Sequence, residues 1–147
     1  MNLKLLATVT IAAVLGAGCA SNSTKYEGPG YAYGCPAGAE KINSKSDLIK
    51  AKVEMAGSIP HIDVVDLRCA ERSGSLRIDV DLKNSSSDVR RIAYKFRWLD
   101  HDGMRAWDDE TWKPLLIYGN TQYTVTTQPP TQEATDFRVV VMDQDKP

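Results

Sequence analysis

The chain has no strong excess of charge of either sign. Its 18 lysine and arginine residues stand against 19 aspartates and glutamates, and its net charge at pH 7 is -1. Binding to nucleic acid requires a basic patch that neutralises phosphates, so this balance excludes nucleic acid as a partner. Long apolar runs are also scarce. The longest, Leu5 to Leu15, is shorter than the roughly 20 residues that a membrane-spanning helix needs.

Cysteine and histidine are rare, with three and two copies. No Cys-x-x-Cys pair occurs, which excludes a zinc ribbon and a thioredoxin-type redox site. His61 and His101 lie far apart, and no Gly-x-Ser-x-Gly stretch supports a serine hydrolase. Asp100, Asp102 and Gly103 look like part of a calcium loop, but no glutamate follows at the EF-hand spacing. We therefore expect a hairpin turn there, with no catalytic residue, no metal and no cofactor.

The N-terminus has the composition of an export signal. Lys4 supplies a positive charge, the apolar run follows, and Gly16, Ala17 and Gly18 end the segment. The glycines would break a buried N-terminal helix, which is the alternative. We therefore expect residues 1–18 to be a signal peptide.

The end of this segment, Leu15 to Cys19, resembles a bacterial lipobox. In such proteins a small residue precedes a cysteine that is acylated and becomes the new N-terminus. The resemblance implies lipidation of Cys19. Ala20 in place of an aspartate implies sorting to the outer membrane, with the chain facing the periplasm. The alternative is ordinary signal-peptide cleavage after Ala20.

Cys35 and Cys69 remain once Cys19 carries lipid. In an oxidising compartment an even pair of cysteines suggests a disulfide, which would tie the N-terminal segment to the domain. The alternative is two separate thiols, one of them buried.

Residues 19–38 are rich in serine, glycine and proline and show no hydrophobic period. We expect the lipidated cysteine and a flexible tether there. Tyr26, Tyr31 and Tyr33 lie within this segment. They either pack loosely on the domain or form a stacking surface for sugar or for a partner protein.

From about Lys52 onward apolar residues recur at every second position, which is the pattern of strands. The clearest strand alternates aliphatic and charged residues over 76–82, and the next places large apolar residues, ending at Trp98, on one face. Pro114 fits an edge strand or a bulge. No convincing helix is found. The expected strands are residues 62–69, 76–82, 92–99, 104–107, 115–118, 123–127 and 137–141. We therefore expect residues 39–147 to form an all-β, immunoglobulin-like β-sandwich of six or seven strands.

Several stretches of this domain together resemble the YcfL-type lipoproteins, small exported proteins of Gram-negative bacteria whose domain has unknown function. These stretches are Leu82 to Ser85, Tyr94 to Asp100, Asp102 with Gly103, Trp112 to Leu115, and Phe137 to Val139. The likeness spans about residues 52–142. It implies a β-sandwich and brings no catalytic residues with it.

Trp107 and Trp112 flank the acidic run of Asp108 to Glu110, which we expect to be solvated. If they are partly exposed, these tryptophans and Tyr118 form a contact surface for a partner. The alternative is that Trp112 packs over the end of the sandwich. We expect a non-enzymatic interaction or scaffold module, anchored in the membrane, with an envelope protein as its partner. The alternatives are an envelope hydrolase or metal-dependent enzyme, and a module that binds cell-wall glycan.

Overall fold

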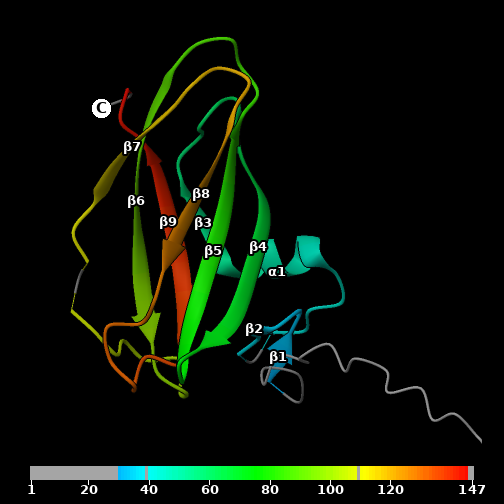
Figure 1. Cartoon of the computed structure of the whole chain (residues 1–147), viewed down its shortest axis with the longest axis vertical. Helices are drawn as coiled ribbons and strands as arrows, with labels where there is room; N and C mark the ends of the chain where they lie inside the picture. Colours follow the sequence, from blue (N-terminus) through cyan, green and yellow to red (C-terminus); the bar gives the residue numbers. More distant parts are fainter. Residues whose placement is uncertain (1–29, 39, 109, 146–147) are drawn as a thin grey trace, which may run out of the picture.

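The computed structural model describes residues 30–38, 40–108 and 110–145. Two β-sheets pack face to face (Figure 1). The four-stranded sheet has the order β3-β9-β6-β7, with β3 at Val53–Ala56, β9 at Asp136–Asp143, β6 at Arg90–Leu99 and β7 at Lys113–Ile117. The three-stranded sheet has the order β4-β5-β8, with β4 at Ile62–Arg72, β5 at Ser75–Asn84 and β8 at Gln122–Thr127. The predicted β-sandwich is therefore confirmed.

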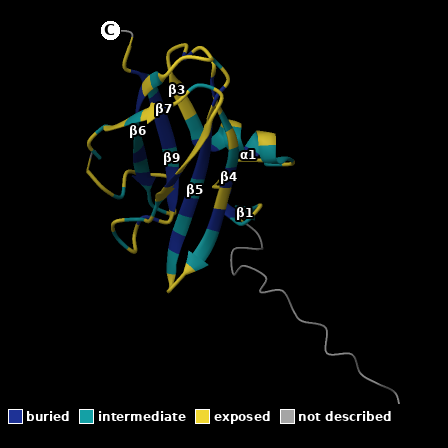
Figure 2. Cartoon of the chain, turned by 45° about the horizontal axis from the view of Figure 1, so that its top comes forward, coloured by how far each residue is buried: buried dark blue, intermediate teal, exposed yellow. Residues whose placement is uncertain are grey.

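β4 and β5 form a hairpin whose turn follows directly from the sequence. Arg72 pairs with Ser75, so Ser73 and Gly74 make a two-residue loop, with φ angles of 54° and 78°. Positive φ at both positions is the turn geometry that matches the twist of paired strands. Along β5 the alternating aliphatic residues are buried, as predicted (Figure 2).

β6 and β9 supply the aromatic part of the core. The rings of Phe96 and Trp98 stack with centroids 5.6 Å apart, and the Phe137 ring lies 6.3 Å and 6.4 Å from them. All three side chains are buried. Because each large aromatic buries about 150–250 Å² on folding, this cluster is a main source of stability. The predicted inward position of Trp98 is confirmed.

Glu110 covers an open part of the β6 edge. β7 pairs with β6 only over Arg90–Tyr94, which leaves the edge beyond it without a strand partner. The Glu110 carboxylate accepts hydrogen bonds from the Phe96 backbone N–H at 3.1 Å and from Trp98 Nε1 at 2.8 Å. Lys113 Nζ lies 3.6 Å from the same carboxylate. The prediction that the acidic run is solvated is therefore wrong for Glu110.

Replacing Glu110 with alanine should lower the free energy of unfolding by about 1–3 kcal/mol, because the buried indole N–H of Trp98 loses its acceptor. Urea unfolding followed by tryptophan fluorescence measures this loss. Asp108→Ala, in the exposed part of the same acidic run, is the control and should be neutral. Equal effects of the two substitutions would contradict a structural role for Glu110.

One short helix, α1 (Lys45–Lys52), corrects the expectation of an all-strand domain. Ser44 caps it, since its hydroxyl accepts a hydrogen bond from the Asp47 N–H at 3.1 Å. Leu48 is fully buried in the core. Two helical turns with so few buried apolar residues are too short to show a helical period, which is why the sequence pattern did not predict the helix.

Two strand predictions also need correction. The expected strand at 104–107 is reduced to a single bridge between Leu99 and Arg105. β3 has no counterpart among the expected strands. It runs parallel to β9, with Val53 paired to Val139, and it is only four residues long. A strand of this length carries too few alternations to be recognised.

A small hairpin of β1 (Tyr31–Ala32) and β2 (Cys35–Pro36) precedes the helix. A Cys35–Cys69 disulfide joins β2 to β4, as predicted. The segment expected to be a tether is therefore ordered in its last part, residues 31–36. Its first part, with Cys19 and Tyr26, lies outside the described residues, and so does the expected signal peptide.

The two described tyrosines of this segment contact the domain. The Tyr33 hydroxyl donates a hydrogen bond to the Asn43 carbonyl at 3.1 Å, and Tyr31 is half-buried. These contacts favour packing over a stacking surface. In the part of the chain that the structure describes, no helix is both long and apolar enough to cross a membrane.

Candidate interaction surface

Edge strand β7 carries an apolar row on the outer face of the four-stranded sheet. Alternate residues of a strand point to the same face, so Pro114 and Leu116 of β7 share the outer face. Trp112 directly precedes the strand and Tyr118 directly follows it at the same spacing, and we call these four residues the β7 row. Leu116 is 50% exposed and Tyr118 is 66% exposed. Val89, which is 48% exposed, precedes β6 at the same end of the strand pair. Large apolar side chains gathered in this way on one face are typical of a contact surface.

The sequence around Tyr118 holds this end of the row in place. The buried Asn84 amide donates to the carbonyl oxygens of Ile117 at 3.0 Å and of Tyr118 at 3.3 Å. Gly119 allows the following turn to approach the neighbouring loop, since a Cβ there would lie 2.0 Å from the Ser87 carbonyl oxygen. Tyr118 is therefore presented by a fixed backbone, although its ring is exposed.

Basic side chains of β6 flank the β7 row. The Lys95 ammonium lies 5.0 Å from the centroid of the Trp112 ring, a cation–π contact. Arg97 pairs with Glu54 of β3 at 3.2 Å, and Arg91 lies 3.5 Å from Asp145. The face therefore combines an apolar row with a border of charged side chains, in which both arginines are paired with carboxylates.

The outer face of the three-stranded sheet is different, because ion pairs link its charged residues. Arg68 donates to both carboxylate oxygens of Asp81, at 2.7 Å and 3.1 Å, and to Asp66 at 2.8 Å. Lys45 from α1 also contacts Asp66. The hydrogen bond from Arg68, helped by that from Thr124, holds the pKa of Asp81 below its usual range. The side chains on this face mostly bond to one another.

The three residues predicted to contact a partner are placed differently by the structure. Trp112 and Tyr118 lie at the two ends of the β7 row. Trp107 is 46% exposed in the connection between β6 and β7 and is not part of the row. Trp112 is half-buried beneath Lys95, on the outer face of the sheet. Leu116 and Pro114, which complete the row, were not predicted.

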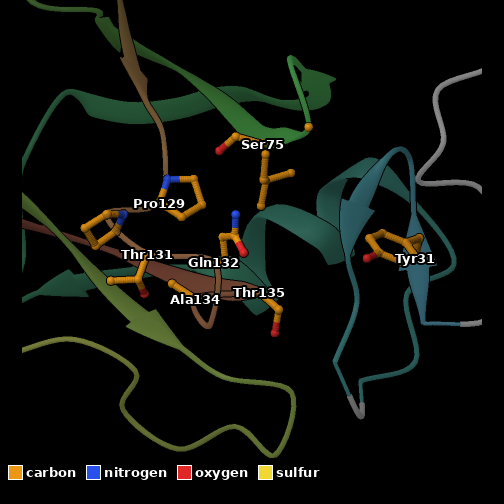
Figure 3. A pocket seen from close by; sticks show the side chains of 10 residues that line it. Tyr31, Ser75, Pro129, Thr131, Gln132, Ala134 and Thr135 are labelled. Carbon is orange, nitrogen blue, oxygen red and sulfur yellow. The ribbon is translucent and has the colours of Figure 1, made fainter.

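Two cavities lie near the β1–β2 hairpin. The first, of about 510 Å³, is lined mainly by the turn before β5 and the connection from β8 to β9. Figure 3 shows Pro129, Thr131, Gln132 and Ser75 around it, with Tyr31 on the hairpin side. The described residues that line this cavity include no aspartate, glutamate, lysine, arginine or histidine, so they offer neutral hydroxyl and amide groups.

The second cavity, of about 520 Å³, has a charged lining that includes Asp100, His101, Asp136 and Arg138. Its carboxylates already have structural partners. Asp100 accepts hydrogen bonds from two backbone N–H groups of its own turn, and Asp136 bonds to Lys52. His101 and its neighbour Asp102 are exposed. The turn predicted over Asp100 to Gly103 is confirmed by the bond from the Gly103 N–H to the Asp100 carbonyl.

Lys52 and Asp136 form a buried ion pair between α1 and β9. The ammonium is wholly buried and lies 2.7 Å and 3.0 Å from the two carboxylate oxygens. Burial lowers the pKa of Lys52, and the hydrogen bond to Asp136 opposes this shift without cancelling it. Because the ammonium has no access to solvent, the pair is a structural element that fixes α1 on the sheet.

Metal-ligating side chains are scattered over the described residues. No three histidine, cysteine, aspartate or glutamate side chains there are close enough to hold a metal ion. His61, at the start of β4, has a φ of 65°, and its carbonyl oxygen accepts a hydrogen bond from the Ser85 N–H. This bond continues the β4–β5 pairing by one residue at the open end of the hairpin, opposite its turn.

Two solved structures are similar to this fold. A Campylobacter jejuni protein, Cj0090, aligns with a TM-score of 0.56 and 25% identity over 63% of this chain and 98% of its own. A DUF1425 family member from a Shewanella species aligns with a TM-score of 0.50 and 30% identity, over 54% of this chain and 75% of its own. No curated protein gives a significant match.

A family model described as "Protein of unknown function (DUF1425)" matches residues 42–143, which cover the helix and both sheets. The narrower resemblance to YcfL-type lipoproteins stays a prediction. The chain belongs to the DUF1425 family.

Proposed function

We propose that this protein is a lipid-anchored interaction module of the bacterial outer membrane that binds an envelope protein through the β7 row. The exposed β7 row carries the proposal. Its Leu116 and Tyr118 side chains are half or more exposed on the outer face of an edge strand. The partner surface that fits this face has apolar side chains bordered by polar ones, because paired charged residues flank the row.

Anchoring at Cys19 would limit where the partner can be. Only the residues between Cys19 and Gly30 separate the proposed acyl group from the first described residue. Fully extended, a segment of this length spans about 40 Å. The β1–β2 hairpin would therefore stay within that distance of the membrane surface. The acyl chains of a bacterial lipoprotein bind the membrane firmly because more than one is present.

The test is chemical cross-linking of the full-length protein in living cells, with two altered chains. Cys19→Ala removes the proposed anchor, and Leu116→Lys places a charge in the β7 row. We expect a small, reproducible set of cross-linked envelope proteins that is lost with either substitution. Leu116 is half-exposed, so its replacement should change the free energy of unfolding by no more than about 0.5 kcal/mol.

The matched control is Val65→Lys. Val65 is 42% exposed on β4 of the other sheet, so this variant makes the same kind of change away from the β7 row. It should leave the cross-linked set intact. If Leu116→Lys retained all partners, or Val65→Lys lost them equally, the β7 row would not be the contact surface.

A further inference from the structure

The two sheets of the sandwich differ in width by one strand. The four-stranded sheet ends in β6 and β7, whereas the three-stranded sheet ends in β8. Tyr94 of β6 and Tyr123 of β8 both lie on inward faces, because Tyr94 alternates with buried residues along β6 and Tyr123 pairs with the buried Leu82. In Figure 1, β8 crosses in front of β9, and β6 and β7 lie further to the left. Among the described residues no strand lies opposite β7.

Beyond β8, the side chains that point toward the interior of the sandwich are incompletely covered. Tyr94 and Leu115 pack against the core but remain partly exposed, and Tyr123 is 48% exposed. The Glu110 loop covers the adjoining part of β6, at Phe96 and Trp98. The uncovered position is therefore the place that a fourth strand of the three-stranded sheet would take.

The backbone of β8 is free to accept such a strand. The Asn84 N–H donates to the Thr121 carbonyl, so these two residues form a hydrogen-bonded pair of the β5–β8 ladder. Along an antiparallel ladder, the backbone N–H and C=O groups of successive residues point alternately toward the paired strand and away from it. The N–H and C=O groups of Gln122, Thr124 and Thr126 therefore point away from β5. No other hydrogen bond between described residues engages them.

The other sheet edges carry features that block strand addition, but β8 does not. β7 contains Pro114, β4 has a bulge between Val64 and Asp66 and packs against α1, and β3 is only four residues long. The β8 sequence, Gln122–Thr127, has no proline, glycine or charged residue and consists mostly of β-branched residues and tyrosine. An unprotected edge of this composition is a template for pairing with another strand.

A second copy of this chain does not fit the site. Symmetric pairing of two β8 strands would join the three-stranded sheets. The β6 and β7 strands extend beyond β8 on this side, so those of the two copies would then overlap. The chain's own N-terminal segment enters at the β1–β2 hairpin, which the disulfide fixes to β4, the far edge of the same sheet. Its sequence, Ser21 to Pro29, lacks alternating apolar residues.

We propose that the free edge of β8 binds an extended segment of a partner chain, whose alternate apolar side chains cover Tyr94, Leu115 and Tyr123. The bound segment completes the three-stranded sheet as a fourth strand. Backbone hydrogen bonds supply affinity and the inward side chains supply selectivity, as in other cases of strand addition. The inference rests on the proposed function in one respect, because a partner protein would supply the bound segment.

The test uses the mature chain, residues 19–147, with Cys19→Ala to keep it free of lipid. The probe is a synthetic eight-residue peptide that alternates isoleucine with threonine and ends in lysine for solubility. Amide hydrogen exchange measured by NMR should slow by about tenfold or more at Thr124 and Thr126 when the peptide saturates. The amide of Val125, which already faces β5, should change little.

Two substitutions locate the binding edge. Thr124→Pro removes an outward N–H, and Tyr123→Lys places a charge on the inward face of the edge. Each should weaken peptide binding by about tenfold or more. Thr124→Val is the matched control, because it loses the Thr124 hydroxyl bond to Asp81 and keeps the backbone donor. Leu116→Lys, on the opposite face of β7, should bind the peptide normally.

Failure of this inference is distinguishable from failure of the proposed function. If the peptide gives no protection at Thr124 and Thr126, or if Thr124→Pro binds it as well as Thr124→Val does, strand addition at β8 is wrong. The partners cross-linked in cells through the β7 row would be unaffected by that result. Peptide protection at β8 supports the inference even where no partner depends on Leu116.

Discussion

Asp136→Ala is expected to lower the free energy of unfolding by about 3–5 kcal/mol, the cost of leaving a buried charge without its partner. Lys52 is wholly buried, and both of its short contacts to Asp136 would be lost. Urea unfolding at neutral pH measures the change. A loss below about 1 kcal/mol would mean that water reaches the ammonium or that the pair contributes nothing.

The double variant Lys52→Met with Asp136→Asn is the control for that prediction. It removes both charges and keeps a side chain of similar size at each position. We expect it to recover more than half of the lost stability, because replacing a buried ion pair by neutral groups avoids the desolvation cost of both charges. If the double variant were as unstable as Asp136→Ala, the loss of stability would come from altered packing and not from the unpaired charge.

The lowered pKa of Lys52 also predicts a dependence on pH. Just below the ordinary lysine pKa of 10.5, the unfolded chain holds a proton that folded Lys52 has released. Stability rises with pH wherever the unfolded state binds more protons, so the wild-type chain should gain stability relative to Lys52→Met as the pH rises through this alkaline range. The comparison cancels other groups that titrate there, such as tyrosines. A falling difference would contradict the lowered pKa.

Loss of the Cys35–Cys69 disulfide should be the second large effect. Replacing both cysteines with serine removes a cross-link across 34 residues, which we expect to cost about 2–4 kcal/mol. The β1–β2 hairpin should then show faster amide exchange than the two sheets, because the disulfide is its covalent link to β4. Melting temperature and hydrogen exchange test both points.

Cys19→Ala is the matched control, since Cys19 takes no part in the disulfide and should leave the melting temperature unchanged. A double serine variant as stable as this control would show that the hairpin packs without the disulfide.

The strands were predictable from sequence where they are long and where one face is apolar and the other is charged. β5 alternates aliphatic and charged residues over eight positions, from Leu76 to Lys83, so its buried face was clear. Pro114 marked an edge because proline cannot donate to a ladder, and β7 is an edge strand. By contrast, α1 and β3 have eight and four residues, and patterns of that length do not distinguish a helix from a strand.

The candidate surface could be predicted only in part. Trp112 was predictable because it flanks the acidic run, and Tyr118 was predicted with it as a contact residue. The outer row of β7 was not apparent because Leu115 and Leu116 are both apolar, so the sequence does not indicate which of them faces out. That choice depends on pairing with β6, which places Leu116 beside Arg91 on the outer face. The contacts of Glu110 with Phe96 and Trp98 likewise could not be predicted, because they depend on β6 extending beyond the end of β7.

Residue-specific photo-cross-linking in living cells tests the central claim most directly. A photoreactive amino acid is placed at Leu116, in the β7 row, or at Val65 of β4 in the full-length, anchored chain. The account predicts that one or a few envelope proteins are cross-linked from position 116 and not from position 65, and that Cys19→Ala abolishes them. Equal cross-linking from both positions, or none from position 116 while the anchor is intact, would contradict an interaction module that works through the β7 row.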